Sequence, residues 1–229
     1  MLPVRDAVPH TAVRIRFSKT GALQYISHLD LHRTFTRLLV RRGVPVWYSE
    51  GFSPHPRLVF ATPLSVGTES VCEFVDVQVT GLPEEVNISD LASRLRDSGI
   101  EGLSIQDVYL PEMKFSSITH ADYEIRFHLP CAGETMAAGC AAALSSSPLI
   151  VLKRTKSGER ETDISAQIRS VSVFLQDDKL LIAARLSADS AHFLNPEYLV
   201  RILRARCGVP DDSYSILRTN VLCGENSFR

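Results

Sequence analysis

Alternation of apolar and polar residues predicts the first strands of the chain. Val13–Phe17 and Val71–Val79 both repeat apolar positions with a period of two, the pattern of a strand with a buried face. Between them, Ser27 precedes an apolar-periodic stretch that stops at Gly43, so a capped helix is predicted over residues 28–42. The other elements predicted in this half are strands at Val44–Tyr48, Leu58–Ala61 and Leu103–Leu110 and a helix at Asp90–Ser98.

The second half of the chain repeats this order of elements. The predicted strands are Tyr123–Leu129, Leu149–Lys153, a hairpin within Ser170–Leu186 and Tyr214–Leu222, and the predicted helices are Gly133–Leu144 and Pro196–Arg206. The tripeptide Ile15–Phe17 returns as Ile125–Phe127. We therefore predict an α+β protein of two tandem ferredoxin-like (β-α-β-β-α-β) lobes, over residues 1–118 and 119–229.

The composition is that of an ordinary globular protein. Of 229 residues, 45% are hydrophobic and 22% charged, and no stretch is apolar enough to span a membrane. The N-terminus lacks a segment of signal-peptide type, so we expect a cytoplasmic protein. The five cysteines are scattered without a C-x-x-C pair, which argues against disulfides, zinc knuckles and iron–sulfur clusters. We expect buried cysteines and no metal or other cofactor.

The net charge of −1 conceals an uneven distribution along the chain. Residues 1–60 carry nine Lys and Arg against three Asp and Glu, whereas residues 61–150 carry four against thirteen. Such asymmetry favours contact between the N-terminal part and an anionic partner. The alternative is that the basic and acidic segments face each other within the fold.

The helix predicted over residues 28–42 separates apolar from basic side chains. Four apolar residues form a stripe about 100° wide, namely Leu31, Phe35, Leu38 and Leu39. The other side carries arginines four residues apart, at Arg33, Arg37 and Arg41. Aligned guanidinium groups repel one another unless anions neutralise them, and arginine binds phosphate through its bidentate fork. This pattern predicts a phosphate-binding face, with an ordinary solvated helix face as the alternative.

Two prolines bracket a histidine in the segment Gly51–Arg57. Because each proline fixes its own φ and extends the residue before it, the loop should present His55 and Arg57 in a defined direction. A turn that needs only rigidity is the alternative. His28 and His32 share a helix face and could join His55 around a metal, but no H-E-x-x-H pattern accompanies them. We therefore predict no metal site.

No pattern in the chain announces an enzyme. It has no nucleophile motif, glycine-rich phosphate loop or dinucleotide fingerprint. Glu69, Glu73 and Asp76 lie on or beside the strand predicted at Val71–Val79, but their spacing alone does not make an acid/base pair. We interpret them as solvated carboxylates of a strand face.

Four segments of the N-terminal part resemble a known family. They are Phe17–Gly21, Tyr25–Asp30, Gly51–Pro56 and Pro63–Gly67, followed by Ser70 and Glu73. Over residues 12–80 the chain resembles the radical SAM-linked protein family, a bacterial domain of unknown function. That domain is fused to a radical SAM protein or forms a separate chain, so the resemblance implies a radical SAM partner. Family members tend to be encoded near ribonuclease and ribosomal-protein genes, which favours RNA.

We therefore expect a non-catalytic accessory protein that binds tRNA or rRNA and presents it to a radical SAM enzyme. The residues expected to contact phosphates are Lys19, Arg33, Arg37, Arg41 and Arg57, and Tyr25 or Phe52 could stack on a base. The resemblance gives the motif site as Tyr25, Ser27, His28, Asp30, Phe52, Ser53, His55 and Glu73.

Two alternative functions stay open. One is a metal-independent ribonuclease that uses His28 or His55 as a general acid or base. Its two lobes would be similar in fold to the RNA-processing endonucleases of CRISPR systems, a likeness that says little about function. The other is a protein–protein adaptor that binds no nucleic acid.

Overall fold

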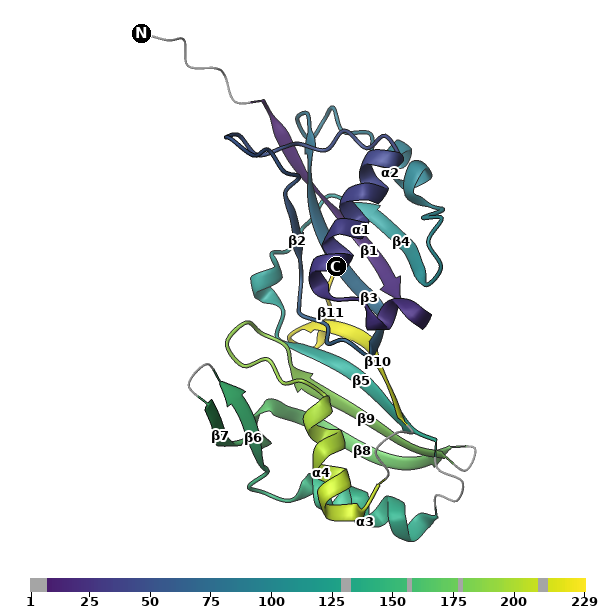
Figure 1. Ribbon diagram of the computed structural model, residues 1–229, viewed down its shortest axis with the longest axis vertical. Coiled ribbons are helices and arrows are strands. Elements are labelled where there is room, and N and C mark those ends of the chain that lie inside the picture. The colour runs from purple at the N-terminus through teal and green to yellow at the C-terminus, as the bar shows by residue number, and fades with distance from the viewer. Residues whose placement is uncertain (1–7, 129–132, 156–157, 177–178, 210–213) are drawn as a thin grey trace. The chain divides into compact units, whose positions relative to one another are not determined.

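The computed structural model describes residues 8–128, 133–155, 158–176, 179–209 and 214–229 (Figure 1). Predictions made for residues 1–7, Leu129 and Cys131 lie outside this part. The described residues form a mixed α+β fold with a large, mostly antiparallel sheet and four α-helices. They divide into two compact units. Unit 1 holds the residues up to Val66, Val71–Lys114 and Arg229, and unit 2 holds Gly67–Ser70 and Phe115–Phe228.

Unit 1 is a four-stranded sheet with two α-helices packed on one face (Figure 1). Its elements are β1 (His10–Lys19), η1 (Gly21–Tyr25), α1 (His28–Arg41), β2 (Leu58–Phe60), β3 (Thr68–Thr80), α2 (Ile88–Leu95) and β4 (Leu103–Tyr109). The strands pair in the order β4-β1-β3-β2, with β4 antiparallel to β1 and β2 antiparallel to β3. Strand β3 begins in unit 2 and continues into unit 1.

The core of unit 1 lies between the apolar faces of its helices and the inward-facing residues of its strands. Phe35 of α1 lies 4.6 Å from Phe17 of β1 and 5.6 Å from Phe60 of β2, measured between ring centroids. The apolar stripe predicted for α1 is confirmed, since the buried residues of this helix are Leu31, Phe35, Leu38 and Leu39. The predicted stop is confirmed as well, because Gly43 takes a φ of 66° that favours glycine.

The strand predicted at Val44–Tyr48 is wrong. This segment makes only isolated bridges, from Val46 to Val79 and from Tyr48 to Pro56. Pro45 lacks the backbone N–H that a continuous ladder needs. The place beside β3 is taken instead by β2, which falls in the segment predicted as extended at Leu58–Ala61.

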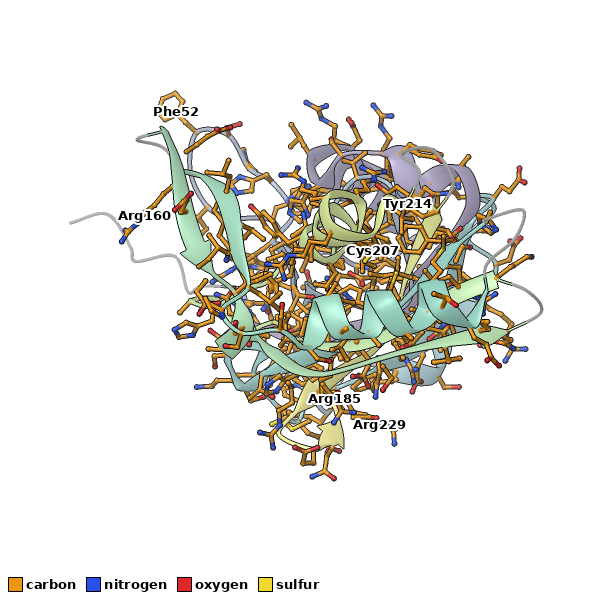
Figure 2. The ribbon with its side chains drawn as sticks, turned by 90° about the horizontal axis from the view of Figure 1, so that it is seen from below. Phe52, Arg160, Arg185, Cys207, Tyr214 and Arg229 are labelled. Carbon is orange, nitrogen blue, oxygen red and sulfur yellow. The ribbon has the colours of Figure 1, made fainter. Side chains whose placement is uncertain are left out.

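Unit 2 is also a sheet with α-helices packed against it (Figure 2). Its elements are η2 (Phe115–Ser117), β5 (His120–Phe127), α3 (Glu134–Ser145), β6 (Ile150–Thr155), β7 (Gly158–Asp163), η3 (Ser165–Gln167), β8 (Ile168–Gln176), β9 (Lys179–Ser187), α4 (Glu197–Cys207), β10 (Tyr214–Cys223) and β11 (Asn226–Ser227). The strands pair in the order β10-β5-β9-β8, all antiparallel. Thr68–Ser70 run parallel to Ile216–Arg218 on the other side of β10.

One predicted strand of this half pairs differently from the expectation. The predicted hairpin within Ser170–Leu186 is confirmed as β8 and β9. The strand predicted at Leu149–Lys153 exists as β6, but it pairs with β7 in a separate two-stranded sheet. The sequence reasoning missed β7 because Gly158–Asp163 contains no apolar residue, so its alternation carries no hydrophobic signal.

Two of the cysteines behave as the composition predicts. Cys72 and Cys140 are buried, whereas Cys207 and Cys223 are half-buried and free. Burial raises the pKa of the Cys140 thiol to about 12, and contact with the Cys207 thiol adds to this shift.

Candidate binding surface of unit 1

Helix α1 carries most of the candidate residues, and Ser27 fixes where it begins. The Ser27 hydroxyl accepts a hydrogen bond from the backbone N–H of Asp30 at 3.1 Å and donates one to the Asp30 carboxylate at 2.7 Å. This is a variant of the capping box, with Asp30 at the third helical position. The Ser27 hydrogen bond, with that of Arg33, holds the pKa of the Asp30 carboxyl below its usual value. Ser27 and Asp30 therefore position the helix.

The three arginines of α1 are exposed but differ in their contacts. Arg33 forms an ion pair with Asp30 at 3.1 Å, and Arg41 donates to the carbonyl oxygen of Ser98 at 3.1 Å. Arg37 has no hydrogen-bond or ion-pair partner within the part of the chain that the structure describes. Of the three, Arg37 is thus the side chain most available to an external anion.

Some basic residues of the N-terminal part do face the acidic segment. Arg14 is buried and holds Asp76 through two hydrogen bonds of 2.7 and 2.9 Å. Arg42 reaches Asp97 at 3.5 Å. These two arginines therefore follow the alternative interpretation of the charge asymmetry, in which basic and acidic segments pair within the fold.

Three histidines, His28, His32 and His55, form a cluster beside β2. The rings of His28 and His32 lie 5.1 and 6.2 Å from the ring of Phe60, which is half-buried. Burial lowers the pKa of His32, and the neighbouring charges of His28 and His55 lower it further. His32 is consequently held in its neutral form at pH 7, where it can accept a proton or a hydrogen bond.

The loop that carries His55 is closed on itself. The Ser49 hydroxyl accepts from the backbone N–H of His55 at 3.2 Å and lies 3.1 Å from Nδ1 of its ring, while the N–H of Ser49 donates to the carbonyl of His55. At the tip, Phe52 is fully exposed, and Ser53 and Arg57 are exposed as well.

A small pocket opens beside His28. It is lined by Lys19, Ile26, Ser27, His28, Leu31, Phe60, Thr62, Leu64 and Glu73. Its volume of about 10 Å³ is room for roughly one water molecule. Lys19 and Glu73 are both buried here, and the Lys19 ammonium donates to the carbonyl of Gln24 at 3.2 Å.

This burial corrects two expectations from the sequence. Lys19 was expected to contact phosphates from the surface, but its side chain is only 2% exposed. Glu73 was expected on a solvated strand face and is only 5% exposed. Both residues continue the inward-facing alternation of their strands, Lys19 after Val13 and Ile15, and Glu73 before Val75. Both side chains line the buried part of the pocket beside His28.

The structure separates the histidines from the arginines on α1. At about 100° per residue, His32 lies about 75° from the middle of the apolar stripe on one flank, and Arg41 about 105° from it on the other. Arg33 lies almost opposite the stripe by the same count. His55 belongs with the histidine flank, whereas Arg37 and Arg41 point the other way.

Exposed apolar residues accompany the histidine flank. Tyr25 and Leu29, in the motif that precedes and opens α1, are 68% and 58% exposed. Sequence reasoning missed Leu29 and also Phe60, the ring that His28 and His32 share. Among the described residues, no group of three or more His, Cys, Asp or Glu is placed to hold a metal ion.

The comparisons with known proteins identify a family. A family model described as an uncharacterized protein conserved in bacteria (DUF2344) matches residues 12–196. The chain belongs to this bacterial family. The match spans every candidate residue of unit 1, and it carries no statement about radical SAM proteins or RNA. A comparison with curated proteins found no match.

Two solved structures share a weak likeness with this family member. A candidate glycine cleavage system transcriptional repressor is 12% identical, with 93% of this chain and 98% of its own covered and a TM-score of 0.25. An unknown protein from Galdieria sulphuraria is 11% identical, with 92% and 99% covered and the same TM-score. Neither likeness bears on function. No helix in the described ranges has the length and apolar character needed to cross a membrane.

Proposed function

We propose that this protein is a non-catalytic binding module of the cytoplasm that holds RNA through unit 1 and acts with a radical SAM enzyme. One observation carries the proposal. Exposed aromatic and cationic side chains lie in or directly beside the motif segments of a single unit, and they include Tyr25, Phe52, His55 and Arg57. Side chains held in this way can contact both the bases and the phosphates of a single strand.

The size of the pocket beside His28 favours a macromolecule over a small substrate. Pockets that bind small molecules usually measure about 300–1,000 Å³. The pocket next to Lys19 and Glu73 has a volume of about 10 Å³. A partner would therefore contact the outer surface of unit 1, where Tyr25, Phe52 and the arginines of α1 are exposed.

The chemistry of the exposed side chains favours RNA. Phenyl rings such as those of Tyr25 and Phe52 stack on unpaired bases, each stack contributing about 1–3 kcal/mol. Arg33, Arg37 and Arg57 are exposed and can reach phosphate oxygens. Arg41 is less available because its guanidinium already donates to the carbonyl of Ser98.

The proposal extends to the fold and the partner. We propose two tandem ferredoxin-like units, and the strand orders β4-β1-β3-β2 and β10-β5-β9-β8 support it, since each places the first and third strands in the middle. The radical SAM partner rests on the resemblance of residues 12–80 alone.

The test is RNA binding measured as a function of salt. Replacing Arg33, Arg37 and Arg57 by Gln should weaken binding to a single-stranded RNA. Each phosphate contact contributes a slope of roughly −0.7 in a plot of log affinity against log salt. Loss of three contacts should therefore make the slope less negative by about two units.

The control changes three exposed arginines of unit 2, Arg126, Arg160 and Arg169, to Gln. It should leave both affinity and slope unchanged. If the Arg33/Arg37/Arg57 variant binds RNA as tightly as the parent protein, the proposal that unit 1 binds RNA is wrong. Copurified protein without RNA would then favour the adaptor function.

A ribonuclease is the second candidate, because the histidine cluster places a neutral imidazole beside two others. Cleavage of RNA in the presence of a metal chelator would support this candidate. His28→Gln and His55→Gln should then abolish cleavage while binding persists. Binding without cleavage by the parent protein would leave the non-catalytic module.

A further inference from the structure

The β6–β7 hairpin of unit 2 forms a two-stranded sheet of its own. Among the residues that the structure describes, β6 and β7 pair only with each other. In both views β6 lies between β7 and α4, so its free edge faces that helix (Figures 1 and 2). A free strand edge presents backbone N–H and C=O groups that another strand can pair with.

A groove lies between this edge and α4. Its volume is about 440 Å³, and its lining residues are Ile150, Val151, Leu152, Glu159, Tyr198, Arg201, Ile202, Ala205 and Arg206. Ile150 and Leu152 are 45% and 55% exposed, although both are aliphatic. Successive side chains of a strand point to opposite faces, so Ile150 and Leu152 share one face of β6 and Val151 and Lys153 the other.

The side of the groove formed by α4 is cationic. The guanidinium of Arg201 lies 5.4 Å from the centre of the Tyr198 ring and has no hydrogen-bond or ion-pair partner in the described ranges. On the β6 side, the ammonium of Lys153 lies 5.6 Å from the same ring and donates to the side-chain oxygen of Gln167 at 2.8 Å. Arg206 adds a third cation and donates to the carbonyl of Ala143, while Glu159 is the one acidic lining residue.

We propose that this groove binds an extended peptide of a partner protein, in which aliphatic and acidic residues alternate. The peptide would add a strand to the free edge of β6. Its aliphatic side chains would then cover Ile150 and Leu152, and its acidic side chains would face Arg201. This fit follows from the period of two that the peptide and β6 share.

The pattern of exposure favours a peptide over a small carboxylate. A small ligand would satisfy Arg201 but would leave the backbone groups of β6 exposed. From Ile150 to Leu152 the edge offers about 7–10 Å of strand, which a few extended residues match. The site lies in unit 2 and does not depend on RNA binding by unit 1.

The test uses the full chain and a short fluorescein-labelled peptide of alternating valine and glutamate, followed by fluorescence anisotropy. Binding should protect the amides of β6 from hydrogen exchange. Arg201→Gln should weaken binding about tenfold, the effect of losing one charge-assisted pair. Arg160→Gln removes the same charge from β7, where the side chain points away from α4 (Figure 2), and should leave binding unchanged.

Two further peptides make the outcomes decisive. A version with lysine in place of glutamate should bind at least about tenfold more weakly, because Arg201 would repel it. A version N-methylated on alternate residues should also lose affinity, since its edge cannot pair. Equal binding of the N-methylated peptide, equal weakening by Arg160→Gln, or no binding of the valine–glutamate peptide at about 1 mM would overturn the proposal.

Discussion

At the scale of single residues, Arg14 shows what holds the outer face of the unit 1 sheet in place. Its side chain is 1% exposed and its guanidinium donates to both carboxylate oxygens of Asp76 and to a backbone oxygen of Arg229. A buried charge is tolerated only when it is paired and hydrogen-bonded. Arg14 therefore depends on Asp76, whose own side chain is 19% exposed.

Removing the charge of Asp76 should destabilise the protein. Asp76→Asn keeps the shape of the side chain but removes the negative charge that accepts two hydrogen bonds from the buried guanidinium, and we expect a loss of roughly 2–4 kcal/mol. Urea denaturation measures it. Asp97→Asn is the matched control, because Asp97 is 86% exposed and its pair with Arg42 should contribute less than about 1 kcal/mol. Equal losses for the two variants would contradict this account.

Part of the burial of charged residues could have been predicted. Lys19 has the same parity as Val13, Ile15 and Phe17, so the alternation that predicted β1 also turns Lys19 inward. Sequence alone could not show that Lys19 and Glu73 line the same pocket, because Glu73 comes from a distant strand. The contact of Arg41 with the Ser98 carbonyl was equally unpredictable, since it depends on where α2 ends.

At the scale of elements, predictability follows the strength of the local signal. Helix α1 was predicted almost to the residue because Ser27, an apolar stripe and Gly43 agree. Strand β7 was missed because all its residues are polar or glycine, and η1 was missed because a helix of five residues is too short to show a period. Tertiary pairing alone defines such elements.

The junction between β1 and η1 depends on one glycine of the segment before β4. Gly102 takes a φ of 79°, and a Cβ there would overlap the carbonyl oxygen of Thr20, whose N–H donates to Gly102 at 2.9 Å. Gly102→Ala should cost roughly 2–5 kcal/mol, the sum of backbone strain and displacement. Gly21 has a similar φ of 61° but open space around it, so Gly21→Ala should cost only about 1–2 kcal/mol. Thermal unfolding of both variants would show whether the steric overlap adds to the strain.

At the scale of the whole molecule, the two units are not simple consecutive pieces of chain. Gly67–Ser70 belong to unit 2, although the rest of β3 belongs to unit 1, and Arg229 belongs to unit 1 although Phe228 lies in unit 2. The sequence predicted a single boundary between residues 118 and 119. Element order and internal repeats can reveal only domains that are continuous in sequence. The parallel pairing of Thr68–Ser70 with β10 joins distant segments and left no local pattern.

This shared strand predicts that the two units unfold together. If unit 1 unfolds, β3 loses its anchor and Thr68–Ser70 should detach from β10, so the free energies of the two units are coupled. Trp47, the single tryptophan, stacks on His10 in unit 1, and its fluorescence reports that unit. Hydrogen exchange of the amides of β5 and β9 reports unit 2. Both signals should change at the same urea concentration.

Insertion of two glycines between Ser70 and Val71 should separate the two unfolding transitions, because one part of β3 could then unfold while the other stays paired. Separate transitions in the parent protein would show that the units are independent despite the strand they share.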